Sequence, residues 1–302
     1  MNAIRRPTVQ AIAGSMLLLV FLSAPVALRA ATNAGPEYLR EVETFRQKRN
    51  ESLRKNWIVL AGLSWLKSGQ NTFGSAQDND VVLPKGPAHA GTFELKGKDV
   101  SLKLEPGTRA TIDGKQPSPT TNMLTDTTGH PTTVAIDSLR ITAIERGGQI
   151  GIRVKDVESP KLKTFTGTQW FPTDPQLRVE AKWVPAQGKK IAITNVLGQT
   201  EMADVPGEAV FTLNGKELHL QPIQEEPDSL FFVFSDATKG ETYPGGRFLD
   251  AELPKDGKVV LDFNKAYSPP CAFTAYATCP LAPKENRLPV RIEAGEKYSG
   301  HH

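Results

Sequence analysis

The sequence predicts a mostly β protein: two antiparallel β-sandwich or barrel-like units preceded by one N-terminal α-helix. From Trp57 onward, short runs of apolar or alternating residues follow one another closely, with turn residues between them. The 23 Pro and 25 Gly residues are spread along the chain and exclude a helical bundle. Many short strands without long crossover helices favour antiparallel sheets over βαβ units.

The first 31 residues have the order of a secretory signal peptide. Arg5 and Arg6 give a basic start, an apolar run over residues 14–24 follows, and small residues lead to Ala31. The run is shorter than the ~20 residues of a membrane-spanning helix. We expect cleavage near Ala31, a periplasmic or secreted protein, and membrane contact only during export. The alternative is a retained hydrophobic anchor.

This segment also accounts for the excess of positive charge. The chain has 36 Lys and Arg against 33 Asp and Glu, and the difference is Arg5, Arg6 and Arg29. The remainder has no net charge and no block of Lys or Arg, so we expect no nucleic-acid partner. The sequence gives no basis for predicting the oligomeric state.

A helix is predicted over residues 37–56. Leu39, Val42, Phe45 and Leu53 recur near helical spacing, and charged residues occupy most other positions. Pro36 suits the first helical turn. We expect the narrow apolar stripe to pack on the body of the protein and the Arg- and Lys-rich face to be solvated.

A soft boundary near Ser159 divides the β region into a first unit over 57–158 and a second over 159–302, which could share a sheet. The dipeptides Asp113-Gly114, Asn214-Gly215 and Gly147-Gly148 stand between strand-like runs, as in tight hairpins. The predicted strands are Trp57–Leu63, Asn71–Phe73, Val81–Leu83, Gly91–Leu95, Val100–Leu104, Ala110–Ile112, Thr133–Ile136, Leu139–Glu145, Gln149–Val154, Arg178–Trp183, Lys190–Asn195, Ala209–Leu213, Glu217–Gln221, Leu230–Phe234 and Lys258–Asp262.

Cys271 and Cys279 are the two cysteines of the chain. In an exported protein such a pair favours a disulfide. The loop would be short and its stabilisation only ~2–3 kcal/mol in the chain-entropy model. Two buried thiols are the alternative, because geometry decides whether the pair can be bridged.

Reaction motifs are missing from the sequence. It has no nucleophile elbow, zinc-protease helix, phosphate loop or dinucleotide fingerprint. His89, His130 and His219 are too widely separated for a metal site, and Asp78-Asn-Asp80 lacks the rest of a calcium loop. We expect no metal and no cofactor.

Polar residues gather in the Pro-rich C-terminal region. Arg247 follows Gly245-Gly246, where the backbone can approach a ligand and a guanidinium could bind a carboxylate or phosphate. We expect Arg247, Asp262, Glu285 and Arg287 to share one neighbourhood. They either form ion pairs that hold the C-terminal segment or line a ligand pocket. The candidate ligand-binding residues are Arg247, Asn264, Asn286 and Arg287, and the candidate catalytic residues are Asp262, Glu285 and Tyr267.

Several spaced motifs together resemble the DUF1684 family, and the resemblance extends over nearly all of the chain after the signal peptide. The family has no established activity, so the resemblance implies a family relationship but no particular reaction or ligand. The segments that carry the resemblance are Trp65–Ser75, Asn79–Pro84, Phe165–Gly167, Phe234–Gly240, Thr242–Leu249, Asp262–Tyr267 and Cys279–Leu288.

The first β unit is also distantly similar to a forkhead-associated β-sandwich, from Asn71 to Lys115. Such modules bind phosphothreonine through an arginine, and Ser75 stands at that position here. The charge-assisted contact is therefore missing, and the resemblance concerns the fold alone.

These observations favour an exported, non-enzymatic binding or structural module. Its rigid C-terminal pocket would take a small anionic or glycan-like ligand. The alternative is a hydrolase that uses Asp262 or Glu285 as general acid or base, with Tyr267 and Arg247 stabilising developing charge.

Overall fold

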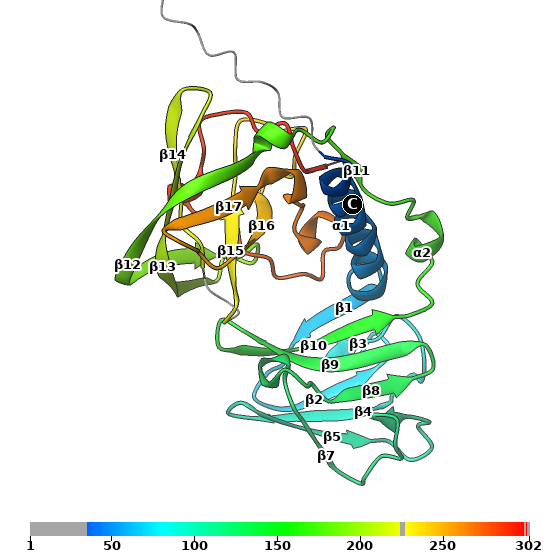
Figure 1. The fold of residues 1–302 in the computed structure, drawn as a ribbon. Coiled ribbons are helices and arrows are strands. Elements are labelled where there is room, and N and C mark those ends of the chain that lie inside the picture. Colours follow the sequence, from blue (N-terminus) through cyan, green and yellow to red (C-terminus); the bar gives the residue numbers. More distant parts are fainter. Residues whose placement is uncertain (1–34, 224–226, 299, 301–302) are drawn as a thin grey trace, which may run out of the picture. The chain divides into compact units, whose positions relative to one another are not determined.

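The structure is a computed structural model that describes residues 35–223, 227–298 and 300. This part of the chain is mostly β, with several antiparallel sheets after one N-terminal helix, as predicted (Figure 1). The expected signal peptide over 1–31 and its cleavage near Ala31 lie outside the described residues. Within the described ranges, no helix combines the length and apolar character needed to cross a membrane.

Helix α1 (Pro36–Asn56) corresponds to the predicted helix and begins at Pro36. Val42 and Leu53 are buried as expected, whereas Leu39 is 44% exposed. Arg49 lies on the same side as these apolar residues and is also buried, because positions 42, 49 and 53 fall on one helical face. The helix therefore buries a charge among its packing residues.

The strands between residues 57 and 158 form two five-stranded sheets. Neighbouring strands are antiparallel except for β2 and β3, which are parallel. The first sheet has the order β1 (Leu60–Trp65), β10 (Gln149–Asp156), β9 (Leu139–Arg146), β8 (Thr133–Ile136) and β6 (Thr111–Ile112). The second has the order β3 (Val81–Val82), β2 (Gly69–Gly74), β4 (Gly91–Lys96), β5 (Asp99–Leu104) and β7 (Thr121–Met123).

One apolar core joins the two sheets, with Phe73 and Phe93 from one and Ile141 and Ile152 from the other. This is the sandwich arrangement. The Gly147-Gly148 hairpin joins β9 to β10 with both glycines at positive φ, as predicted. The narrower resemblance to a forkhead-associated module stays a prediction.

The strands after residue 159 form three further sheets. The largest has the order β14 (Lys216–Leu220), β13 (Thr200–Leu213), β12 (Arg178–Thr194) and β17 (Lys258–Asp262). The two-stranded sheets are β15 (Ser229–Phe234) with β16 (Arg247–Glu252), and β11 (Gln169–Trp170) with β18 (Glu296–Lys297). The short helical segments are α2 (Lys161–Thr164) and the 3-10 turns Asp126–Thr128, Pro175–Leu177, Phe263–Lys265, Pro270–Ala272 and Lys284–Asn286.

The predicted strands differ from the structure at several places: β7, β11 and β18 were not predicted, and β13 begins at Thr200 and not at Ala209. The runs Arg178–Trp183 and Lys190–Asn195 belong to one strand, β12, whose pairing with β13 shifts register between Pro185 and Lys189. Strand β16 was not predicted, because its polar residues Arg247 and Asp250 gave it the pattern of a loop.

The second core lies under β12 to β17 and is rich in aromatic residues. Phe211, Phe232, Phe234 and Phe263 are its largest members. The chain after β17 covers this core, and its side chains Leu288, Val290 and Ile292 pack into the same apolar cluster. The C-terminal segment is therefore part of the packed core and not a surface loop.

Candidate functional site

Arg247, at the start of β16, is almost completely buried. Its Nη2 donates to Oδ2 of Asp236 at 2.6 Å and to the carbonyl oxygen of Ile292 at 3.1 Å, and its Nη1 donates to the carbonyl oxygen of Ala294. Burial lowers the pKa of the guanidinium, and the charge of Asp236 opposes this shift. These contacts favour the interpretation in which Arg247 holds the C-terminal segment.

The two glycines before Arg247 lie where the backbone packs closely against other segments of the protein. At Gly246, φ is 111°, and a Cβ atom would meet the carbonyl oxygen of Phe234 at 2.8 Å and the Cβ of Ala282 at 2.9 Å. Glycine is needed there for packing. The close approach therefore does not mark a ligand.

Asp262 and Asn264 connect the end of β17 to other elements. The Tyr38 hydroxyl of α1 donates to Oδ1 of Asp262 at 2.8 Å, and burial raises the pKa of Tyr38. Buried Asn264 accepts from the backbone N–H of Asp174 at 2.8 Å and donates to its carbonyl oxygen at 2.7 Å. Both side chains thus join distant segments.

The run Glu285-Asn286-Arg287 is divided between core and solvent. Asn286 is buried and donates to the carbonyl oxygens of Gln221 at 2.8 Å and Val233 at 2.9 Å. Glu285 and Arg287 are exposed. Across the described residues, no hydrogen bond or ion pair links Arg247 to Asp262 or to Glu285; its carboxylate partner is Asp236.

The disulfide predicted between Cys271 and Cys279 is not formed in the structure. Both side chains are buried, and the backbone N–H of Cys271 donates to Sγ of Cys279 at 3.2 Å. A hydrogen bond between the thiols raises the pKa of Cys279 and lowers that of Cys271. The pair is therefore held by hydrogen bonds and apolar packing.

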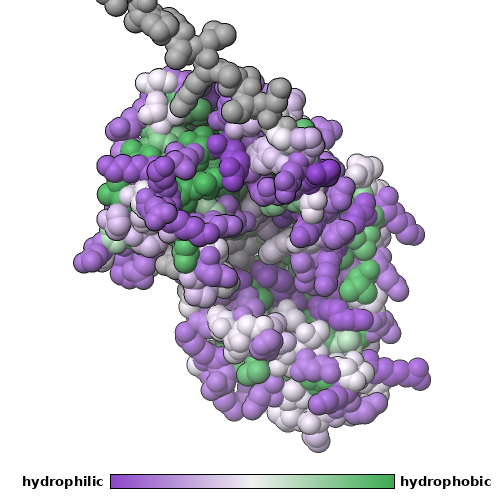
Figure 2. All heavy atoms as spheres, in the orientation of Figure 1, coloured by the Kyte–Doolittle hydropathy of each residue, from purple (hydrophilic) through white to green (hydrophobic). Residues whose placement is uncertain are grey.

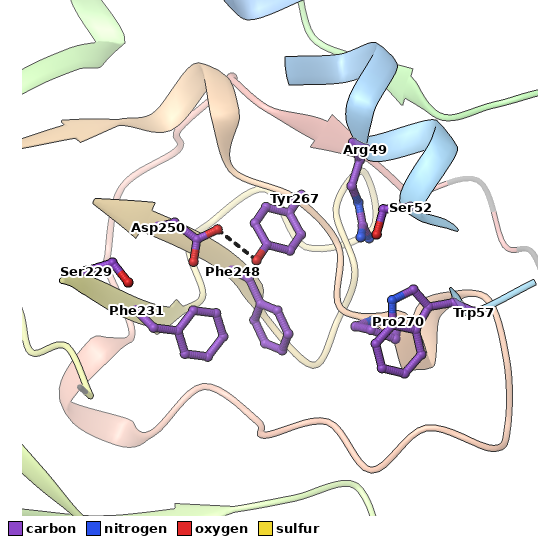
Figure 3. A pocket seen from close by; sticks show the side chains of 9 residues that line it. All are labelled: Arg49, Ser52, Trp57, Ser229, Phe231, Phe248, Asp250, Tyr267 and Pro270. Atoms are coloured by element: carbon purple, nitrogen blue, oxygen red, sulfur yellow. Dashed lines mark hydrogen bonds between the residues drawn. The ribbon is translucent and has the colours of Figure 1, made fainter. Parts of the chain in front are cut away.

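A cleft of about 310 Å³ lies between α1, the β15–β16 pair and the segment after β17 (Figure 3). Its size falls at the lower end of small-molecule sites, which run from about 300 to 1,000 Å³. We call it the aromatic cleft. It is lined by Arg49, Ser52, Trp57, Ser229, Phe231, Phe248, Asp250, Tyr267 and Pro270.

Aromatic rings form much of the wall of the aromatic cleft. The rings of Phe231 and Phe248 meet edge to face with centroids 4.8 Å apart, and those of Phe248 and Tyr267 do so at 5.8 Å. Such contacts restrain the rings, because the positive edge of one faces the negative face of the next. The cleft therefore has a pre-formed apolar surface.

Asp250 supplies the carboxyl group among these lining residues. The Tyr267 hydroxyl donates to its Oδ2 at 3.0 Å, as the dashed line in Figure 3 shows. Asp250 is exposed to water, yet the protein around its carboxyl displaces enough solvent to raise the pKa of this group. The Tyr267 hydrogen bond and the charge of Arg49 oppose this shift.

Arg49 enters the cleft from α1 beside Ser52 (Figure 3). Its Nε donates to Oε2 of Glu296 at 3.3 Å and its Nη2 to the carbonyl oxygen of Ser268 at 2.6 Å. The guanidinium also lies 4.7 Å from the ring centroid of Tyr267. Glu296 is fully buried, and burial raises the pKa of its carboxyl.

The charges of this site do not favour an anion. Glu296 balances Arg49, and Asp250 adds a further carboxyl. Hydroxyl, carboxyl and guanidinium groups beside aromatic rings can instead hold a neutral polar ligand that has an apolar face. Within the described ranges, no group of three or more His, Cys, Asp or Glu side chains could hold a metal ion.

Tyr267 is the residue of the aromatic cleft that the sequence prediction also named. Arg49 was recognisable as a charge on the helical stripe that carries Val42, Phe45 and Leu53. Asp250 gave no such signal, because it lies on an unpredicted strand.

Comparisons with known proteins give kinship but no activity. A family model described as "Protein of unknown function (DUF1684)" matches residues 163–297. A solution NMR structure of an uncharacterized protein of Haloarcula marismortui is 31% identical over 48% of this chain and 83% of that one, with a TM-score of 0.40. None of the curated proteins compared is similar to this chain.

Replacing Arg247 tests its structural role. Arg247→Ala should lower the free energy of unfolding by about 3–5 kcal/mol, because it leaves the buried Asp236 carboxylate without its partner. Arg287→Ala, which removes an exposed arginine from the C-terminal segment, should change stability by no more than about 0.5 kcal/mol. Urea denaturation measures both. Equal, small effects would contradict the structural assignment.

The raised pKa of Asp250 predicts a pH-dependent stability difference. The folded protein holds this proton more tightly than the unfolded chain. Proton binding at Asp250 therefore contributes its full stabilisation of the fold below about pH 4, the ordinary carboxyl pKa, and this contribution is lost as pH rises. Asp250→Asn should therefore gain stability relative to wild type between pH 4 and 7. A variant that loses stability over that interval, by urea denaturation, would argue against a raised pKa.

Proposed function

Because the chain belongs to the DUF1684 family, which is described as of unknown function, we propose a function from its geometry: a binding protein that takes a small, uncharged, glycan-like ligand in the aromatic cleft. The observation that carries this proposal is the position of Asp250 and Tyr267, hydrogen-bonded to each other at the edge of an aromatic wall.

Sugar rings need two kinds of contact. Their hydroxyl groups pair with carboxylates, hydroxyls and guanidinium groups, which Asp250, Tyr267 and Arg49 present. Their C–H faces pack on apolar and aromatic side chains such as Trp57 and Phe231. The combination supports the glycan-like ligand over the anionic one that we also expected.

Hydrolysis of such a ligand is a second candidate, supported by the raised pKa of Asp250. A carboxyl that holds its proton nearer to neutral pH can act as a general acid. In this version Asp250 takes the role that the sequence suggested for Asp262 or Glu285. Asp262 is bound to Tyr38, and Glu285 lies at the exposed surface.

Calorimetric titration with uncharged sugars tests the binding proposal. Glucose, galactose, N-acetylglucosamine and their dimers form the panel, and sulfate, phosphate and glucuronate serve as anionic probes. We expect an uncharged sugar to bind and Asp250→Ala to weaken that binding by at least about tenfold, the loss of one charge-assisted hydrogen bond.

The matched control is Glu217→Ala, which removes an exposed carboxyl from β14 outside the cleft. Its affinity should equal that of wild type. Binding of the anions alone, or equal losses in both variants, would contradict the proposal. Release of monosaccharide from the dimers in the same samples, lost in Asp250→Asn, would identify the hydrolase.

We also propose that the protein acts outside the cytoplasm, because the first 31 residues have the order of an export signal. Expression of the full chain in bacteria, followed by N-terminal sequencing of the periplasmic fraction and medium, should give a start at Ala31 or Thr32. A cytoplasmic product that retains residues 1–31 would overturn this proposal.

A further inference from the structure

A second hollow adjoins the aromatic cleft at Asp250. It has a volume of about 470 Å³ and is bounded by the end of β16, β17 and the start of β12. We call it the outer groove. Its lining includes Arg178, Glu180, Asp250, Lys258, Val260 and Asp262. Because Asp250 also lines the aromatic cleft, the two hollows adjoin at this residue.

A third hollow also lies next to both the aromatic cleft and the outer groove. It is lined by Ser229, which also belongs to the aromatic cleft, and by Lys265, which also belongs to the outer groove. Asp250 lines all three. The hollowed surface therefore continues from the aromatic wall past Asp250 and onto the β12–β17 pair.

The floor of the outer groove is the outward face of two paired strands. Glu180 of β12 lies opposite Val260 of β17, and Arg178 lies opposite Asp262. Since alternate residues of a strand share a face, the exposed side chains at 178, 180, 258 and 260 point the same way. Val260 is 37% exposed and places an apolar spot among charged neighbours.

The outer groove is lined by six carboxyl side chains and four basic ones, and several of these groups form ion pairs with each other. Nζ of Lys258 lies 2.6 Å from Oε1 of Glu180, with both side chains 59% exposed. Nζ of Lys265 lies 3.5 Å from Oδ2 of Asp262. An ionic ligand would therefore face like and opposite charges together. A neutral chain of hydroxyl groups can pair with donors and acceptors of both signs.

We propose that the natural ligand is an uncharged oligosaccharide, with one ring in the aromatic cleft and the following rings along the outer groove. This inference rests on the proposed function and extends it from a single sugar to a chain. Val260 offers an apolar contact for a ring face, and Glu180 and Arg178 offer hydrogen bonds to its hydroxyls. The ligand class follows from the continuity of the hollows, from the ion pairs along the outer groove and from its excess of carboxyl groups, which disfavours an anion.

Affinity as a function of chain length tests the proposal. The probes are glucose, cellobiose, cellotriose and cellotetraose, with the matching malto- and chito-oligosaccharide series, titrated by calorimetry into wild type, Glu180→Ala and Glu217→Ala. In one series we expect the trimer to bind at least about tenfold more tightly than the monomer, as about 1.4 kcal/mol of added contact gives.

Glu180→Ala should lose most of that gain and keep the monomer affinity, because Glu180 lines the outer groove but not the aromatic cleft. Both substituted glutamates are exposed on strands, so the variants should have the melting temperature of wild type. Glu217→Ala should bind every sugar as wild type does.

The outcomes separate the two proposals. Monomer binding that depends on Asp250, with no gain from chain length in any series, would overturn the oligosaccharide inference and leave the proposed function intact. A length-dependent gain that survives in Glu180→Ala, or is equally lost in Glu217→Ala, would overturn the assignment of the outer groove. If no sugar binds, both proposals are overturned.

Discussion

The position of Arg49 is the constraint on which the aromatic cleft depends. This side chain leaves α1, reaches the carbonyl oxygen of Ser268 and the carboxyl of Glu296, and lies over the ring of Tyr267. It thereby fixes the helix against two parts of the C-terminal segment that are far apart in sequence. Burying a guanidinium and a carboxyl costs several kcal/mol of desolvation for each ion, which their attraction and added hydrogen bonds offset. Arg49 thereby lies against the ring of Tyr267, whose hydroxyl donates in turn to Asp250.

Most of the other unusual polar residues near the C-terminus also serve the fold. Arg247 binds Asp236 and two backbone carbonyl oxygens, while Asn286 binds three backbone groups of Gln221 and Val233. Buried backbone groups must find partners when an irregular segment covers a core. The Pro-rich chain has few regular strands, and these side chains supply the partners that a sheet would otherwise provide. Its rigidity leaves the aromatic cleft pre-formed, which lowers the entropy cost of binding a ligand.

The features that could be predicted are those set by local sequence. Glycines at positive φ defined the Gly147-Gly148 hairpin, and the apolar spacing around Val42 and Leu53 defined α1, because both depend on neighbouring residues. The residues of the site were harder to predict from the sequence. Arg247 signalled a carboxylate partner, but which carboxylate depends on how the ends of β15 and β16 meet the C-terminal segment. Asp250 became visible only with β16 in place, since its raised pKa arises from protein atoms distant in sequence. The disulfide failed for a similar reason: spacing alone does not set the geometry that joins two sulfur atoms.

The central claim is that Asp250 is a partly desolvated carboxyl that contacts an uncharged sugar. An NMR titration of its side-chain carboxyl carbon, followed over pH with and without cellotriose, maltotriose and chitotriose, tests this most directly. The account predicts a pKa above the ordinary range of about 3.9 for an aspartate in the free protein, and a change of both the signal and the pKa when one of these sugars binds. An ordinary pKa together with a signal that none of the sugars alters would contradict it.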